Sequence, residues 1–143
     1  SYKQVKITEV GAEESPHELI RIVFQVLQEN LTELSTKIHL TDESWQKSFD
    51  KCMFALSILR ESLDFEKGGE IATNLDRLYS FSQSQILKAV GKSSSDLLKV
   101  AIDIISDISS AWDEIRPTNI KIVYFSRNIV ILLKPLRLPK IVP

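Results

Sequence analysis

The longest stretch without proline constrains this chain more than any other feature of its sequence. Pro16 stands near the start, the other prolines begin at Pro117, and none lies between them. Proline breaks an interior helical turn because it lacks a backbone N–H and its ring collides with the preceding turn. Across this proline-free stretch, apolar residues recur at spacings of three and four, which predicts a succession of long amphipathic helices.

The first two helices are predicted from apolar spacing and from capping residues. The first starts at Ser15-Pro16, where Ser15 can cap and Pro16 fits the first helical position, and it runs to about Lys37. The second starts after Thr41 or Asp42, which are both competent caps. Their expected core residues are Leu19, Val23, Leu27, Leu31, Leu34, Ile38, Trp45, Phe49, Cys52, Leu56, Leu59 and Leu63.

Glycines and serines divide the rest of the stretch. Gly68-Gly69 should end or bend the second helix, because each interior glycine costs about 1 kcal/mol relative to alanine. A third helix is expected from about Glu70 to Gly91, and a fourth follows a cap at Ser93 or Ser94. The apolar positions of the third helix are Ile71, Leu75, Leu78, Ile86 and Val90. The apolar stripe of the fourth consists of Leu97, Leu98, Ala101, Ile102, Ile105, Ile108, Trp112 and Ile115.

Four helices joined by short connections favour an all-α fold, an antiparallel up-down four-helix bundle. An apolar content of 43% suffices for such a core. The sequence predicts three parts: an N-terminal segment (1–14), a helical bundle (15–116) and a C-terminal extension (117–143).

The C-terminal extension differs from the bundle in charge and in residue type. Residues 1–115 carry 12 Lys and Arg against 19 Asp and Glu, whereas residues 116–143 carry six basic residues and no acid. Two β-branched runs, 120–125 and 129–133, flank Ser126-Arg127-Asn128, which predicts a β-hairpin. Because a lone hairpin is marginally stable in water, we expect it to pack on the bundle, on a second copy or on another partner.

Catalytic and metal-binding patterns are missing from the sequence. His17 falls in a first helical turn and His39 lies beyond that helix, so neither sits where a di-iron or phosphotransfer bundle needs it. Cys52 lies on a core stripe and reads as a small buried hydrophobe. No apolar run is long enough to span a membrane, and the small net charge of −1 argues against nucleic acid as the partner. The sequence therefore predicts a binding module without cofactor or metal, and not an enzyme.

Three motifs carry a resemblance to a known family. The central one is Leu63-Asp64-Phe65-Glu66-Lys67-Gly68-Gly69-Glu70-Ile71-Ala72, continued by Asn74-Leu75-Asp76-Arg77-Leu78-Tyr79. Ser15-Pro16-His17-Glu18-Leu19 precedes it and Ala111-Trp112-Asp113-Glu114-Ile115 follows it. Together they resemble the flagellar secretion chaperone family FliS, over about residues 15–115.

The resemblance implies a cytoplasmic chaperone without a reaction. Its client would be the C-terminal segment of flagellin, disordered in the monomer and helical in the filament. The chaperone would block premature polymerisation and assist delivery to the type III export gate. The alternative is a divergent helical adaptor for another flagellar or export protein, and a homodimer remains open.

Resemblance and off-stripe apolar spacing together nominate client-binding residues. They are Phe54, Ile58, Leu75, Leu78, Tyr79, Ile86 and, through the N-terminal segment, Tyr2. Residues expected to act structurally are Ser15, Pro16, Gly68, Gly69 and Trp112. One departure from the family pattern lies in the first helix, where Val23-Phe24-Gln25-Val26 replaces a leucine-tyrosine-Asp/Asn-glycine run and could alter a client or dimer surface.

Overall fold

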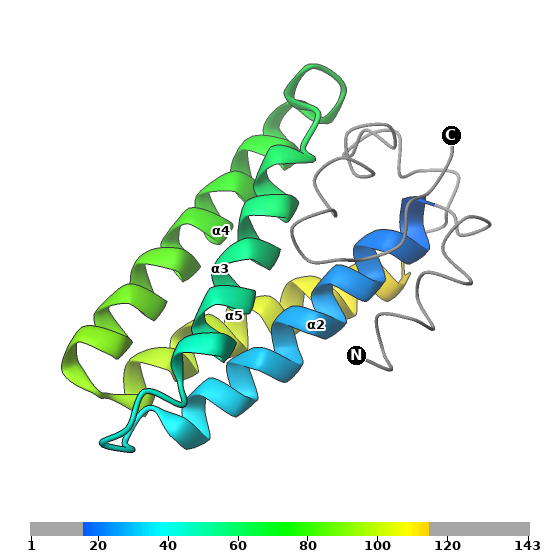
Figure 1. Ribbon diagram of the computed structural model, residues 1–143. Coiled ribbons are helices and arrows are strands. Elements are labelled where there is room, and N and C mark those ends of the chain that lie inside the picture. The colour runs from blue at the N-terminus through cyan, green and yellow to red at the C-terminus, as the bar shows by residue number, and fades with distance from the viewer. Residues whose placement is uncertain (1–15, 115–143) are drawn as a thin grey trace.

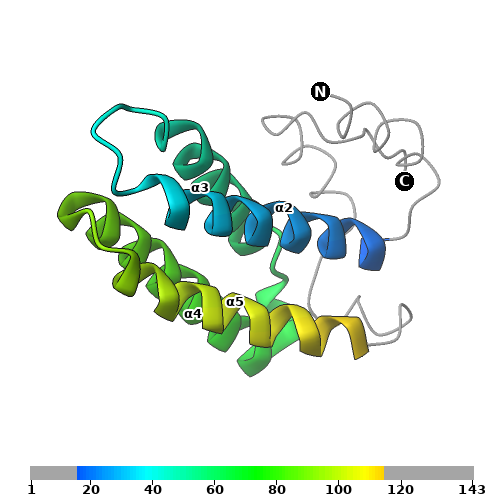
Figure 2. The same cartoon turned by 90° about the horizontal axis from the view of Figure 1, so that it is seen from below.

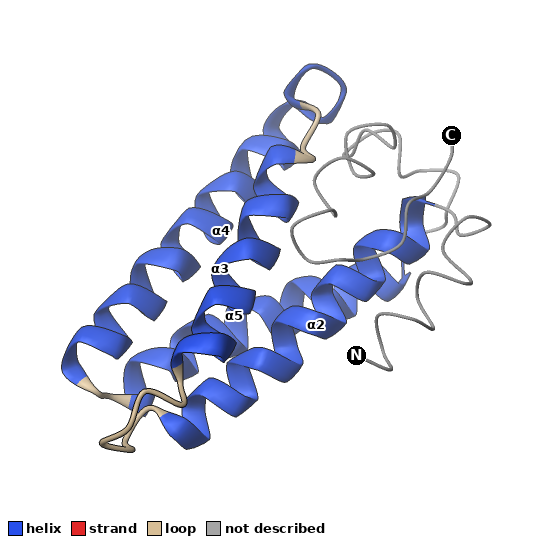
Figure 3. Ribbon diagram, viewed as in Figure 1, coloured by secondary structure: helices blue, strands red, loops and turns tan. Residues whose placement is uncertain are grey.

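The computed structural model describes residues 16–114, and these fold into helices joined by short turns (Figures 1 and 3). Tyr2, the Ser15 cap, Ile115 and the predicted hairpin in 117–143 lie outside the described residues. The four helices are α2 (Pro16–Lys37), α3 (Gln46–Glu61), α4 (Phe65–Lys92) and α5 (Ser95–Glu114).

The described helices form an antiparallel bundle, which confirms the predicted fold class. Each helix packs on two others: α2 contacts α3 and α5, and α4 also contacts α3 and α5. Successive helices run in opposite directions (Figures 1 and 2). In Figure 1, α3 and α4 lie side by side and tilt away from α2 and α5 toward the end where α3 leads into α4.

Apolar side chains from all four helices fill the bundle. The predicted stripe of α2 is buried throughout, from Leu19 to Ile38. Phe24 lies at the centre, with its ring 6.4 Å from the rings of both Tyr79 on α4 and Trp112 on α5. Buried Val23 and Phe24 therefore belong to the core, and the unusual Val23–Val26 run exposes only Gln25. The departure from the family pattern at Val23–Val26 therefore affects the packing of the core more than it affects a client or dimer surface.

A pair of reciprocal contacts joins the start of α2 to the end of α5. The His17 Nε2 group donates to the carbonyl oxygen of Trp112 at 3.0 Å, and Trp112 Nε1 donates to the carbonyl oxygen of His17 at 3.1 Å. The two rings stack with centroids 5.0 Å apart. The motifs around Pro16 and Trp112, 95 residues apart in sequence, thus meet at one end of the bundle.

The predicted start of the second helix is wrong by several residues. Helix α3 starts at Gln46, and Trp45 occupies the cap position without a side-chain hydrogen bond. The Asp42 carboxylate instead accepts a hydrogen bond from the Ser44 backbone N–H at 3.0 Å within the connecting loop. Aspartate favours such local turns as much as helix caps, and spacing alone does not distinguish the two uses.

The boundary between the second and third helices also differs from the prediction. Helix α3 ends at Glu61, and α4 starts at Phe65 with Asp64 as its cap, whose side chain accepts from the Lys67 N–H at 2.9 Å. Gly68-Gly69 falls inside α4, where Gly69 has φ 50° and ψ −125° and kinks the helix. The glycines therefore bend the third helix instead of ending the second.

The predicted stop at Gly91 lies one residue too early. Helix α4 continues to Lys92, and Ser93 takes the left-handed conformation at φ 49°. Ser93 N–H donates to the carbonyl oxygen of Val90 at 3.3 Å, and Ser94 N–H donates to that of Ala89 at 2.9 Å. These bonds satisfy terminal carbonyl groups of α4, the role usually given to a C-terminal glycine.

Candidate protein-binding surface

One face of α4 changes character along its length. Its residues follow each other at spacings of three and four, so they share that face. In order they are Ile71, Leu75, Leu78, Ser82, Gln85 and Ala89. The second half of this row, with small or polar side chains, is buried in the bundle, whereas the first half, with large apolar side chains, is not.

The exposed part of this face is substantial. Ile71 is 55% exposed, Leu78 is 38% exposed, and Phe81, three residues further on, is 47% exposed, while Leu75 is half-buried against the core. We name these four residues, Ile71, Leu75, Leu78 and Phe81, the α4 apolar face. It coincides with the part of α4 that tilts away from α2 and α5 (Figure 1). Contiguous exposed apolar surface of this kind marks protein-interaction sites.

The sequence-predicted site residues divide between this surface and the core. Leu75 and Leu78 lie on the α4 apolar face, whereas Tyr79 and Ile86 are fully buried. On α3, Phe54 is 47% exposed but Ile58 is buried. Their proposed contacts with a client stay predictions, and in this structure only Phe54, Leu75 and Leu78 are accessible among those on the bundle.

Two exposed members of the α4 apolar face were not nominated from sequence. The sequence identifies Ile71 only as an apolar position of the third helix and does not single out Phe81, and both are exposed. The spacing of apolar residues along α4 is the same whether or not a neighbouring helix packs against them. Periodicity therefore could not show that Ile71 and Phe81 are exposed. The nearby signal was the polar middle of the helix: Ser82 and Gln85 occupy the buried half of the same row.

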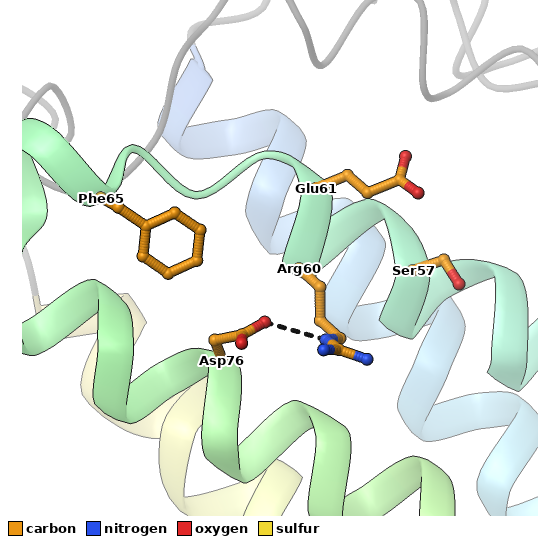
Figure 4. Close-up of a pocket in the computed structure, with 5 residues that line it drawn as sticks. All are labelled: Ser57, Arg60, Glu61, Phe65 and Asp76. Carbon is orange, nitrogen blue, oxygen red and sulfur yellow. Dashed lines mark hydrogen bonds and ion pairs between the residues drawn. The ribbon is translucent and has the colours of Figure 1, made fainter.

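A polar network links α3 to α4 at the same end of the bundle. Arg60 Nε donates to Asp76 Oδ1 at 2.9 Å, and Arg60 Nη1 donates to Gln83 Oε1 at 2.9 Å. Gln83 Nε2 in turn donates to Ser57 Oγ at 3.4 Å. A pocket of about 470 Å³ opens beside this network, lined by Ser57, Arg60, Glu61, Phe65 and Asp76 (Figure 4).

Residues 16–114 give little support for a metal site, a reactive cysteine or a membrane-spanning helix. No group of three or more His, Cys, Asp or Glu side chains there could hold a metal ion. Burial raises the pKa of the Cys52 thiol to about 12, which keeps it protonated and unreactive. Among the described helices, none has the length and apolar character needed to span a membrane.

A helical bundle with an unpartnered apolar helix face is typical of protein-binding modules that accept a partner segment in a groove. The sequence model of the family described as Flagellar protein FliS matches residues 1–119. The chain therefore belongs to the FliS family, which confirms the resemblance given by its motifs.

Individual relatives agree with this assignment. The chain is 33% identical over 122 residues to the flagellar secretion chaperone FliS of Vibrio cholerae, a match that covers 82% of this chain and 87% of the relative. It is 31% identical to the flagellar secretion chaperone FliSB of Pseudomonas aeruginosa, covering 80% and 91%. For FliS of Salmonella typhimurium the identity is 30%, covering 82% and 88%. The family is one of chaperones; that this chain catalyses no reaction stays a prediction.

Proposed function

We propose that this protein is a cytoplasmic export chaperone that binds the C-terminal segment of flagellin. In binding it, the protein prevents premature polymerisation and assists type III flagellar export at the export gate. Membership of the FliS family supports the chaperone role, since the relatives named above are flagellar secretion chaperones. The observation that carries the client site is the α4 apolar face, whose large side chains lack cover from the described helices.

The physical basis is the compensation of ordering entropy. A disordered segment that folds into a helix on binding loses conformational freedom, so the interface must bury enough apolar surface to offset that loss. Fully burying a leucine, isoleucine or phenylalanine side chain contributes about 1.5–3 kcal/mol. Ile71 and Leu78 present such side chains two turns apart on α4, and Phe81 follows about one turn later, at spacings that an amphipathic client helix can cover.

A matched pair of leucines on α4 tests the client site. Leu78 and Leu87 are both exposed, at 38% and 54%, but they are nine residues apart and so project from opposite sides of the helix. Leu78→Glu should weaken binding of the flagellin C-terminal peptide about tenfold, a loss of about 1.4 kcal/mol. Leu87→Glu should leave the affinity within about twofold, because that side lies away from the proposed site.

The measurement is isothermal titration calorimetry with the C-terminal peptide of the organism's own flagellin, after circular dichroism shows unchanged helicity in both variants. Equal weakening by both substitutions contradicts the placement on the α4 apolar face. Absence of binding by the unmodified protein contradicts the flagellin role itself and favours the alternative, an adaptor for another flagellar or export protein. Phe54→Asp extends the test to α3, where the side chain is also exposed.

A further inference from the structure

The pocket between α3 and α4 differs chemically from the α4 apolar face. Its floor is the Arg60–Asp76 ion pair, one wall is the ring of Phe65, and Glu61 extends outward at the rim (Figure 4). Phe65 is 51% exposed, although phenylalanine is among the residue types most often buried in folded proteins. Asp76 faces α3 through Arg60, whereas Leu78 two residues later projects to a different side of α4.

The charges around this pocket favour a basic side chain as the occupant. The lining holds two carboxylates, Glu61 and Asp76, and one guanidinium, Arg60, so it carries a net negative charge. Asp76 pairs with Arg60, whereas the Glu61 carboxylate points outward and is not paired with Arg60. The C-terminal end of α3, at Glu61, adds the negative pole of a helix dipole. The face of an aromatic ring such as Phe65 also attracts cations. An arginine or lysine with apolar neighbours meets all three features.

We propose that this pocket docks the basic C-terminal segment of the same chain, residues 116–143. That segment carries six basic residues (Arg116, Lys121, Arg127, Lys134, Arg137 and Lys140) and no acid, among many β-branched and aromatic residues. Residues 1–115 carry a surplus of seven acidic charges, 19 against 12, so attraction between the two parts is strong at low salt.

Chain direction places the end of α5, from which this segment continues, at the same end of the bundle as the pocket. Because neighbouring helices are antiparallel, the end of α5 and the start of α4 lie at the same end of the bundle as the end of α3 (Figure 1). Glu114, the last described residue, therefore lies at the end of the bundle where the pocket opens. A dozen residues in extended conformation reach about 40 Å, which is enough to cross the width of a small helical bundle.

Docking would also restrain a segment with an aggregation hazard. Runs of β-branched and aromatic residues such as 120–125 and 129–133 pair readily with other chains when they are free. An intramolecular contact raises the effective concentration of the pocket for the segment to the millimolar range, so even weak contacts compete with association between chains. The proposed docking is thus a contact within one chain, and it requires no client.

A spin label in the extension tests the proposal in the full-length chain. Ser126→Cys places a thiol beside Arg127, and a nitroxide attached there should broaden the amide NMR signals of Glu61, Phe65 and Asp76 to about half intensity or less. Native Cys52 is buried with its pKa raised to about 12, so it stays unlabelled. Signals of Asp42 and Ser44, in the α2–α3 loop at the opposite end of the bundle, should keep their intensity.

A second pair of substitutions isolates the charge contribution. Glu61→Lys should abolish the broadening at Phe65, whereas Glu43→Lys, an equal charge reversal in the distant loop, should leave it unchanged. Broadening that survives Glu61→Lys, or that spreads evenly over the bundle, overturns the proposal. The proposal is also overturned if mixing two samples gives broadening between chains. In that mixture one chain carries the isotope label and no nitroxide, and the other carries the nitroxide and no isotope label. Broadening of the isotope-labelled chain then means that the segment docks on a second copy. Flagellin is absent from every arm, so the result does not depend on the proposed function.

Discussion

Gly69 and Gly91 stand in the same helix, but their backbones make opposite demands on the side chain. Gly69 has φ 50° and ψ −125°, a conformation that side chains strongly disfavour, whereas Gly91 has no positive φ and lies in the continuous part of α4. A Cβ added at either position meets no atom within 4 Å, so collision plays no part in either substitution.

Gly69→Ala should therefore lower the free energy of unfolding by about 1–3 kcal/mol, the cost of backbone strain alone. Gly91→Ala should raise it by up to about 1 kcal/mol, because alanine loses less entropy in a helix. Urea denaturation of both variants measures the two changes. A Gly69→Ala variant as stable as the parent would mean that α4 straightens without cost, and the kink would then have no energetic basis in the glycine.

At the start of α2, an ion pair predicts a dependence on pH. Hydrogen bonds from Arg21 hold the pKa of Glu18 below its usual value of 4.5. A carboxylate whose folded pKa is lowered contributes stability above that usual value and loses it as the pH falls through the folded pKa. Arg21→Gln should therefore lower the free energy of unfolding at pH 7 by less than about 1 kcal/mol, since the pair is partly exposed.

The same comparison at pH 3 should show a smaller difference between the parent and Arg21→Gln. Arg77→Gln, at an exposed arginine on α4, serves as the control and should alter stability little at either pH. Urea titrations at both pH values provide the measurement. A difference that stays constant from pH 7 to pH 3 would exclude the titration of Glu18 as its source.

Helix boundaries show which parts of the elements could be predicted from the sequence. The start of the first helix was found because Ser15-Pro16 combines a cap with a residue confined to the first turn; Pro16 does begin α2, while Ser15 lies outside the described residues. The predicted break between α3 and α4 is misplaced because Gly68-Gly69 is the stronger helix-breaking signal in the sequence. The actual cap of α4 is Asp64. Local signals of similar strength compete, and only tertiary packing decides between them.

Asp64 and Asp42 give a direct test of this assignment. Both carboxylates accept a backbone N–H, but Asp64 caps α4 from a buried position and Asp42 lies in an exposed loop. Asp64→Ala should lower the free energy of unfolding by about 1 kcal/mol, whereas Asp64→Asn, which keeps an acceptor, should cost much less. Asp42→Ala should change stability by less than about 0.5 kcal/mol. Thermal unfolding that is more sensitive to Asp42→Ala would reinstate the cap predicted from sequence.

At the scale of the whole molecule, the fold was predictable and the candidate site only in part. Apolar spacing identified four helices and most of the buried stripe, because burial of one face follows from helical geometry. It could not show that α3 and α4 tilt away from the other pair, which exposes Ile71 and Leu78 and leaves Tyr79 buried. The Arg60–Asp76 contact spans two helices and has no signature at short range in the sequence.

Removing the C-terminal extension tests whether the helical bundle folds without it. The FliS match ends at residue 119, and the buried cluster from Leu19 to Trp112 joins all four described helices. A chain ending at Asn119 should therefore keep one cooperative unfolding transition, with a free energy of unfolding within about 1 kcal/mol of the full-length value, because docking through exposed ion pairs contributes little.

The mean helicity per residue of this shortened chain should rise, since the residues removed are rich in β-branched side chains and prolines. Circular dichroism with urea measures both quantities, and light scattering at equal concentration should show less association. Loss of the cooperative transition would mean that residues 120–143 belong to the core, against the three-part division of the chain.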